Sequence, residues 1–363
     1  MNNKLASFDN DIDFPRLWKI GAAISLVALL LSGGALIFRG LNLGIDFEGG
    51  TSWEVEAPGV SVADARDDLG SVGAGGAKIQ IVGSDTLRVQ SEPSDDEARN
   101  AITERLAETA GTDAAEVSVS TVGPTWGDEI SSKAQRALVF FFVIISAYIA
   151  IRLEWKMAIG ALAAVAHDIV ITVGVYALFQ FEVTPATVIA VLTILGYSLY
   201  DTIVVYDKVQ ENAENPAVAQ KMAYTDLMSL SLNQVLMRSL NTTITSLMPV
   251  LAMLVVGSFL LGAVTLQEFA VALTVGLVTG AYSSVFVATP LVAILKEREP
   301  HYRNLRSRLE FQQARKSDQQ AVAAGVGATA ASRSSRRSGG AAEPPELSGR
   351  VIPPRPRKKG KRR

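Results

Sequence analysis

Three charged residues lie within or beside long apolar runs, where their side chains could carry chemistry. Asp201 lies inside the run that starts near Pro185, and Asp168 lies in the middle of the preceding run. Arg238 stands at the entrance of the following run. A charged side chain in hydrocarbon is costly, and it usually faces a partner or a wet path and marks a functional site. These positions therefore predict ion or proton chemistry inside a membrane.

Asp201 is the strongest candidate for a group that binds a proton. Burial raises the pKa of a carboxyl group and a nearby guanidinium lowers it, so a small movement can load or release a proton. Arg238, Thr242 and either Thr245 or Ser246 share one face of a helix, and such hydroxyl groups can hold water. The competing interpretation is a buried ion pair between Asp201 and Arg238 that only orients two helices.

The adjacent pair His167-Asp168 leaves two interpretations open, a structural polar contact and a direct role in a proton relay. Other chemistry has little support. The sequence contains no cysteine and two histidines, which excludes thiolate and histidine-based metal sites. It shows no Walker motif and no nucleophile elbow. We therefore expect no enzyme and no cofactor, with protons as the coupling ion.

Six apolar runs must position these residues. Each has roughly the length of a membrane-spanning helix, about 20 residues. The first run, 20–38, follows a basic segment as a signal peptide would, but no Ala-x-Ala site follows it, which favours an uncleaved helix. The pattern predicts a polytopic membrane protein with spans near 20–38, 137–151, 157–181, 186–206, 240–261 and 269–295. Gly276-x-x-x-Gly280 and Ser283-Ser284 in the last span, and Gly33-Gly34 in the first, provide small residues for close helix contact.

One sizeable soluble domain, at 39–133, follows the first run. Its elements are predicted in the order strand, helix, strand, strand, helix, strand, which is typical of a ferredoxin-like α+β fold. Ser61 is the expected N-cap of the first helix and Ser94 that of the second. The predicted elements are 51–56, 62–69, 78–82, 86–90, 94–109 and 116–122.

Charge predicts the orientation of the chain. Lys and Arg gather in the N-terminus at 1–19, in the loop at 152–156 and in the loop 207–238, so these segments are expected in the cytoplasm. The domain at 39–133 is then extracytoplasmic, and spans two to six occupy 134–296. The tail at 297–363 is expected to be disordered, basic and cytoplasmic. Contact with anionic lipid, contact with the ribosome, and a merely solvated tail all stay open for it.

Four motifs resemble the SecF family of protein-export membrane subunits, which belongs to the resistance-nodulation-division superfamily. The first follows span one and contains Gly44, Asp46, Phe47, Glu48, Gly49 and Gly50. The second runs from Gly196 through Asp201 to Asn212, and the third from Ser231 to Thr242. His167-Asp168 is the fourth. The resemblance covers about residues 15–296.

The resemblance implies a function. Members of this family pair with SecD, work with the SecYEG channel in the cell membrane, and use the proton motive force to draw an unfolded preprotein outward. It implies a proton pathway through Asp201, Arg238, Thr242 and Asp168, and a structural role for the motif after the first span. Two alternatives stay open, a small-molecule or lipid exporter of the same superfamily and a translocon assembly scaffold that transports nothing.

Overall fold

The computed structural model describes residues 12–83, 85–92, 95–260, 264–312 and 315. The tail predicted to be disordered over 297–363 is helical at 300–312, so that prediction is wrong for these residues, and most of the remaining tail lies outside the described residues. The predicted cap at Ser94 also lies outside them. Contacts are described below for residues up to Ser307, which form one compact unit.

Six helices in the described part are long and apolar enough to cross a membrane, as predicted. Two of them contain π-helical segments, η2 (Met253–Leu260) and η3 (Ser284–Ala288). The six are α1 (Phe14–Arg39), α5 (Pro124–Arg152), α6 (Trp155–Phe179), α7 (Pro185–Glu214), α9 (Tyr224–Ala252) continuing into η2, and α10 (Val264–Ser283) continuing through η3 into α11 (Thr289–Glu297).

The interval 207–238, predicted as a cytoplasmic loop, is mostly helical. Helix α7 runs on to Glu214 and α9 begins at Tyr224, with the short α8 (Pro216–Ala219) between them. Polar residues do not end a helix by themselves, and Lys208 bonds Glu211 along the helix surface at 2.8 Å. The helix ends at Asn215 because the following Pro216 disfavours α-helical backbone in the residue before it.

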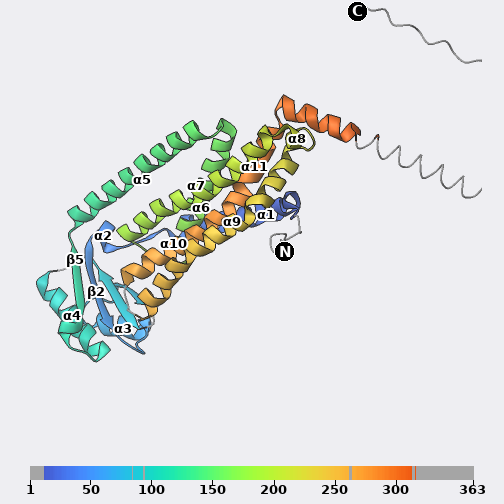
Figure 1. Ribbon diagram of the computed structural model, residues 1–363. Coiled ribbons are helices and arrows are strands. Elements are labelled where there is room, and N and C mark those ends of the chain that lie inside the picture. Colours follow the sequence, from blue (N-terminus) through green and yellow to red (C-terminus); the bar gives the residue numbers. More distant parts are fainter. Residues whose placement is uncertain (1–11, 84, 93–94, 261–263, 313–314, 316–363) are drawn as a thin grey trace, which may run out of the picture. The chain divides into compact units, whose positions relative to one another are not determined.

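Helices α6, α7 and α10 form the packed centre of the membrane region (Figure 1). Glycines on α10 allow the close approach that the Gly276-x-x-x-Gly280 pattern predicts. A Cβ atom at Gly280 would lie 2.9 Å from the Cβ of Ser198, and one at Gly276 would overlap Ile194. The same prediction for Gly33-Gly34 is wrong, since a Cβ at either position meets nothing within 4 Å. Helix α1 instead approaches its neighbours at Gly21, against Phe286, and at Ser32, against Gly174.

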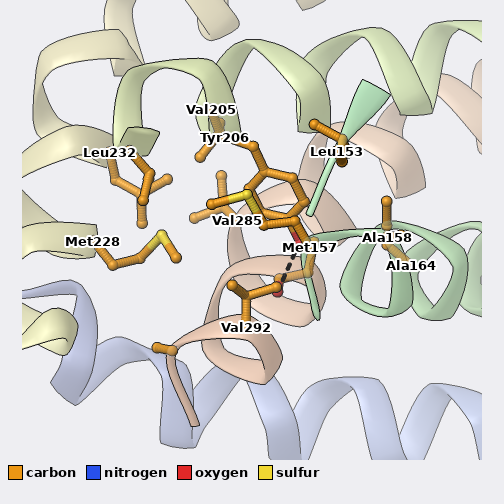
Figure 2. Packing of buried hydrophobic residues seen from close by; sticks show 14 of the residues in the cluster. Leu153, Met157, Ala158, Ala164, Val205, Tyr206, Met228, Leu232, Val285 and Val292 are labelled. Carbon is orange, nitrogen blue, oxygen red and sulfur yellow. Dashed lines mark hydrogen bonds between the residues drawn. The ribbon is translucent and has the colours of Figure 1, made fainter. Parts of the chain in front are cut away.

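One apolar cluster joins the cytoplasm-predicted halves of these helices, with Tyr206 at its centre (Figure 2). The Tyr206 ring is fully buried among side chains from α6, α9 and α11, including Met157, Met228 and Val292. Its hydroxyl donates to the backbone oxygen of Ala288 at 3.1 Å. Tyr206 therefore fixes α7 against the last residue of the π-helical segment η3.

Pro290 accounts for the irregular backbone of η3. Proline has no N–H, so the carbonyl of Phe286, four residues earlier, cannot receive its usual α-helical hydrogen bond. A π-helical turn contains one extra residue, and such turns are frequent at functional sites. Compared with a continuous α-helix, the segment 284–288 therefore rotates the side chains that precede it relative to those that follow it.

The soluble domain has the predicted ferredoxin-like order. Its strands form one antiparallel sheet in the order β3-β4-β2-β5, with α3 and α4 packed against the apolar face around Trp53. Ser61 caps α3 as predicted, and Asp95 caps α4 by accepting from the backbone N–H of Ala98. The elements are β2 (Gly50–Glu56), α3 (Val62–Gly70), β3 (Lys78–Val82), β4 (Thr86–Ser91), α4 (Asp96–Ala110), the 3-10 turn η1 (Ala114–Glu116) and β5 (Ser118–Val122).

Three short elements join this domain to the helices. After α1, strand β1 (Asn42–Leu43) pairs in parallel with β6 (Glu182–Val183), which lies between α6 and α7. Helix α2 (Ile45–Glu48) follows, and a sequence of four residues carries too little periodicity to predict it. These elements bring the loop between α6 and α7 beneath the sheet.

Candidate functional site

Asp201 is a buried carboxylate that binds hydroxyl groups from two other helices. Ser239 of α9 donates to its Oδ1, and Ser284 of η3 donates to its Oδ2 at 2.7 Å. The side chain lies in the middle of α7 and its residue is 9% exposed. Both oxygens of Asp201 are therefore bonded by neutral donors, which can hold an ionised or a protonated carboxyl group by rotating the hydroxyl.

Asp168 on α6 has a closely similar environment and is fully buried. Its Oδ2 accepts from Ser198 of α7 at 2.5 Å and from Ser283 of α10 at 2.8 Å. Its Oδ1 lies 3.1 Å from Nδ1 of His167. The buried Nε2 of His167 has no hydrogen-bond partner among the described residues. Asp168 thus holds three helices together, and whether it also relays protons stays a prediction.

Two consecutive serines connect the two carboxylates. Consecutive residues of an α-helix point about 100° apart, so Ser283 and Ser284 reach different neighbouring helices. Ser283 bonds Asp168 on α6 and Ser284 bonds Asp201 on α7. From the sequence, Ser283 and Ser284 are only small residues suited to close helix packing. The structure shows that they donate hydrogen bonds to both intramembrane carboxylates.

A small cavity adjoins Asp201. Its volume is about 30 Å³, room for one or two water molecules. Leu277, Gly280 and Ala281 of α10 line it together with Asp201 and with hydroxyl-bearing residues of α7 and α9: Tyr197, Ser198, Tyr200, Thr242, Thr243 and Ser246. The structure therefore brings Thr242 and Ser246 beside Asp201. Thr245 instead donates to Asn241 and Thr242 of its own helix.

Arg238 is not bonded to Asp201 in this structure. Its guanidinium is exposed and donates to the hydroxyl of Tyr200 at 3.4 Å, and none of the ion pairs among the described residues includes it. Arg238 and Thr242 lie on one face of α9, as predicted, and Thr242 donates to the Arg238 carbonyl at 2.9 Å. The ion pair between Asp201 and Arg238, which the sequence left open as the competing interpretation, is not present among the described residues, where serines bond both oxygens of Asp201.

A second charged cluster lies where the soluble domain meets the helices. Arg88 of β4 is buried and donates to Glu54 at 2.8 Å, to Glu268 of α10 at 2.6 Å, and to Glu182 of β6. Gln90 donates to the other oxygen of Glu182 at 2.6 Å. Burial by itself lowers the pKa of Arg88, but Glu182, Glu268 and Glu54 raise it by a larger amount, so the guanidinium stays charged. This cluster was not found from the sequence, although an arginine in an otherwise amphipathic strand was a visible signal.

The glycine-rich motif after α1 makes room for this junction. Glu182 lies so close to Gly44 that a Cβ there would overlap its carboxylate. Gly49 and Gly50 have φ angles of 79° and 130°, which L-residues with a side chain rarely adopt. A Cβ at Gly49 would lie 2.9 Å from Pro124, the first residue of α5.

The other residues of this motif lie at the same junction. Phe47 is buried, and its carbonyl accepts from Ser131 of α5 at 3.3 Å. Glu48 pairs with Lys78 of β3 at 3.0 Å on the surface. Burial and the charge of Glu182 raise the pKa of Asp46, and Arg88 counteracts them. The motif therefore lies where α1, α5 and the sheet converge.

The remaining motif residues link α7 and α9 at the end predicted to be cytoplasmic. The Asn212 amide donates to Ser231 at 2.8 Å and to Gln234 at 2.9 Å. Asn233 exchanges hydrogen bonds with the backbone of Ile12, just before α1. The second and third sequence motifs are therefore in contact with each other.

These features define a multi-pass membrane protein with a paired intramembrane carboxylate site and one ferredoxin-like domain. The model of the family "Protein export membrane protein SecD/SecF, C-terminal" matches residues 102–298, and that of the "SecD/SecF GG Motif" matches residues 34–57. The chain belongs to this family of protein-export membrane proteins, on its SecF side.

Proteins similar in sequence to this chain are named as subunits of a protein translocase. The protein translocase subunit SecF of Streptomyces coelicolor is 39% identical over 345 residues, which cover 94% of this chain and 90% of that protein. The protein translocase subunit SecDF of Thermus thermophilus is 35% identical over 284 residues, 76% of this chain and 37% of that one. A crystal structure of the Thermus SecDF, described as a translocon-associated membrane protein, aligns with a TM-score of 0.70 at 34% identity. The alignment covers 80% of this chain, which spans 39% of that longer one.

Proposed function

We propose that this chain is the SecF subunit of a protein translocase, which with a SecD partner uses the proton motive force to promote preprotein export through SecYEG. Asp201 is the group that binds the proton. The observation that carries this proposal is the setting of Asp201, a buried carboxylate within a membrane-spanning helix, beside a water-sized cavity and with a neutral hydroxyl on each oxygen.

Protonation of Asp201 changes its bonding. An ionised carboxylate only accepts hydrogen bonds, whereas a protonated one also donates, so one of the two serine contacts must change when a proton binds. The cavity beside Thr242 provides a place for the water that delivers the proton. A membrane potential supplies about 2.3 kcal/mol per charge per 100 mV, which is sufficient to bias two conformations.

We place the soluble domain outside the cytoplasm and both termini inside, in the cell membrane. In support, the domain bonds the loop at Glu182 and the start of α10 at Glu268, and so shares their side of the helices. Basic residues gather at the opposite helix ends, where Lys156 and Lys296 pair with Glu299. Binding of the tail to anionic lipid or to the ribosome stays a prediction about residues outside those described.

The two alternatives have less support. The scaffold interpretation relied on an ion pair between Asp201 and Arg238, and that contact is absent among the described residues. The exporter interpretation expects two six-helix halves with two large soluble domains in one chain, whereas the described residues hold six candidate spans and one such domain.

The decisive experiment replaces Asp201 with Asn and measures preprotein translocation into inverted vesicles, with and without a proton gradient. We expect Asp201→Asn to abolish the gradient-dependent part of translocation, because the amide cannot bind and release a proton. Asp207→Asn is the matched control, since Asp207 lies six residues further along the same helix, is partly exposed and pairs with Arg152 on the surface. SecD pairing is measured by co-purification.

A full response to the gradient in the Asp201→Asn variant contradicts the proton-site proposal. Drug or lipid efflux by the wild-type subunit, without any secretion defect in a deletion strain, supports the exporter interpretation instead.

A further inference from the structure

A cavity of about 180 Å³ lies between α5, α6 and α7, and its lining is mainly aliphatic. None of the described residues that line it carries a charge. Among its polar lining residues, Tyr176 donates to a backbone carbonyl of α10 at 2.7 Å, and Thr187 accepts from the backbone N–H of Thr184 at 3.2 Å. The oxygen of Thr172 is itself buried. A buried water molecule needs several polar partners, so this cavity excludes water.

The cavity lies at the depth of lipid acyl chains. On α6 it extends from Ile169 to Tyr176, which is roughly 10 Å at the helical rise of 1.5 Å per residue. Helix α6 ends at Phe179, roughly 5 Å beyond Tyr176. On α7 the lining residues run from Thr187 to Val191, in the first two turns of that helix. Because the hydrocarbon core of a bilayer is about 30 Å thick, the cavity lies within the leaflet on the side of the soluble domain.

Helix α5 is held at its two ends and stands apart from α6 and α7 between them (Figure 1). At the domain end, a Cβ atom at Gly127 would lie 2.9 Å from the carbonyl oxygen of Phe47. Towards the other end, Phe141 packs against the apolar cluster of Figure 2, and Ile149 is fully buried in it. Leu138 lies between these contacts and lines the cavity. Since both ends are fixed, α5 cannot close the cavity by moving inward.

The size and lining of the cavity indicate what fills it. An empty apolar cavity is unfavourable in proportion to its volume, and a dry aliphatic cavity of about 150 Å³ binds small apolar molecules. A helix of a partner protein is about 10–12 Å across with its side chains, which is too wide to enter. Acyl chains are thin, and they surround the outer face of α5, where Val139, Phe140 and Val143 are more than half exposed.

We propose that this cavity is a lipid site, which takes one acyl chain of a phospholipid from the leaflet on the side of the soluble domain. The chain enters sideways from the bilayer past Leu138 and lies against Val173 of α6 and Val188 of α7. The strand pair β1–β6 covers the site on the domain side, since Leu41 precedes β1, Val183 belongs to β6, and both line the cavity. The lipid thereby forms part of the contact between α5 and the other helices. This inference is independent of the proposed function, because it involves no proton.

The site recognises the acyl chain and not the headgroup. No Lys or Arg of the described part of the chain lines the cavity, so a negatively charged headgroup gains no counter-charge within it. The favourable term is the burial of methylene groups, which is the same for any phospholipid with the same chains. Phosphatidylglycerol and phosphatidylcholine should therefore bind equally well.

The test locates the acyl chain inside the protein. The full chain, in complex with SecD, is placed in nanodiscs that contain a phospholipid with a photoreactive diazirine midway along one acyl chain. After illumination, cross-linked residues are identified by peptide mass spectrometry. We expect cross-links at Ile169 and Val191 in the cavity, with the phosphatidylglycerol and the phosphatidylcholine probe alike. Leu30, which is exposed on α1, reports the lipids that surround the protein.

Two variants fill the cavity, so that the test does not depend on the folding of either one. In Val173→Phe and in Val188→Phe, cross-linking at Ile169 and Val191 should fall roughly 10-fold, because the added ring takes the place of the methylene groups. Cross-linking at Leu30 should stay within about 2-fold. Val143→Phe is the matched control, since it makes the same change on the exposed face of α5. Co-purification with SecD verifies that each variant is folded.

Three results overturn the proposal. The first is the absence of cross-links at Ile169 and Val191 in the wild-type chain, or equal levels in all the variants. The second is cross-linking with the phosphatidylglycerol probe alone, which indicates a site for an anionic headgroup. The third is a disulfide between Val188→Cys and a cysteine placed in a SecD membrane helix, which shows that the partner fills the cavity.

Discussion

The two polar clusters of this protein hold buried carboxylates in different ways. Glu182 and Glu268 at the domain junction share the guanidinium of Arg88, a permanent counter-charge. Asp201 and Asp168 between the helices are bonded mainly by serine hydroxyls, which carry no charge. An ion pair fixes the charge state of a carboxylate, whereas hydroxyls tolerate both states. The contacts at the junction therefore require ionised carboxylates, whereas the hydroxyl contacts of the intramembrane site do not by themselves require either protonation state.

The largest expected effect comes from removing the counter-charge at the junction. Arg88→Met leaves two buried carboxylates unpaired, and breaking a buried ion pair by removing one partner costs about 3–5 kcal/mol. We expect the free energy of unfolding in detergent to fall by this amount. Arg99→Met is the control, because Arg99 pairs with an exposed Asp96 and such pairs contribute about 0–1 kcal/mol. Equal losses in both variants contradict the view of the junction as a buried ion-pair cluster.

A smaller loss of stability is expected at Gly280, where the close packing of α10 on α7 positions the hydroxyl of Ser198. Gly280→Ala places a Cβ atom 2.9 Å from that of Ser198, and overpacking of this kind costs about 1–3 kcal/mol. The change pushes Ser198 away from Asp168. In Gly33→Ala the new methyl group meets nothing, so stability should stay the same or rise by up to about 1 kcal/mol. Thermal unfolding in nanodiscs measures both, and a harmless Gly280→Ala would refute the close contact of α10 with α7.

The hydroxyls around the cavity should matter less than the carboxylate itself. Thr242→Val keeps the shape of the side chain and removes one hydrogen-bonding group beside Asp201. We expect gradient-driven translocation to slow roughly 5-fold, the equivalent of one hydrogen bond of about 1 kcal/mol. Thr245→Val should leave the rate unchanged, since Thr245 is exposed and does not line the cavity. Equal rates in the two variants would argue against water in the cavity as the proton donor.

The smallest expected effect is on the pH dependence of stability, through Asp46 at the edge of the junction. The pKa of Asp46 is raised in the folded protein by burial and by Glu182, so the folded state binds this proton more tightly than the unfolded one. The resulting stabilisation is present below the unfolded pKa and is lost as pH rises through the folded pKa. We expect Asp46→Asn to remove this dependence. Unfolding measured between pH 3 and 6 for both proteins tests it, and parallel curves would contradict it.

Much of the fold follows from local patterns in the sequence. The six spans follow from length and hydrophobicity, and the ferredoxin-like order follows from alternation in the strands and a cap such as Ser61. The predicted helix ends were less accurate, because helices continue through polar residues until a residue such as Pro216 ends them. The small residues of α10 were correctly assigned to close packing, but Gly33-Gly34 shows that small residues do not by themselves create a contact.

The sequence by itself singled out Asp201 and Asp168, since a carboxylate in an apolar run is visible without any structure. Only the tertiary structure decided what each one bonds. Ser239 and Ser284 are 38 and 83 residues from Asp201, and Arg88 is 94 and 180 residues from its two buried partners. Helical periodicity tells which face a residue occupies, but the partner across that face depends on how helices pack. For this reason the nearest charged candidate, Arg238, was expected beside Asp201, where the structure has two serines.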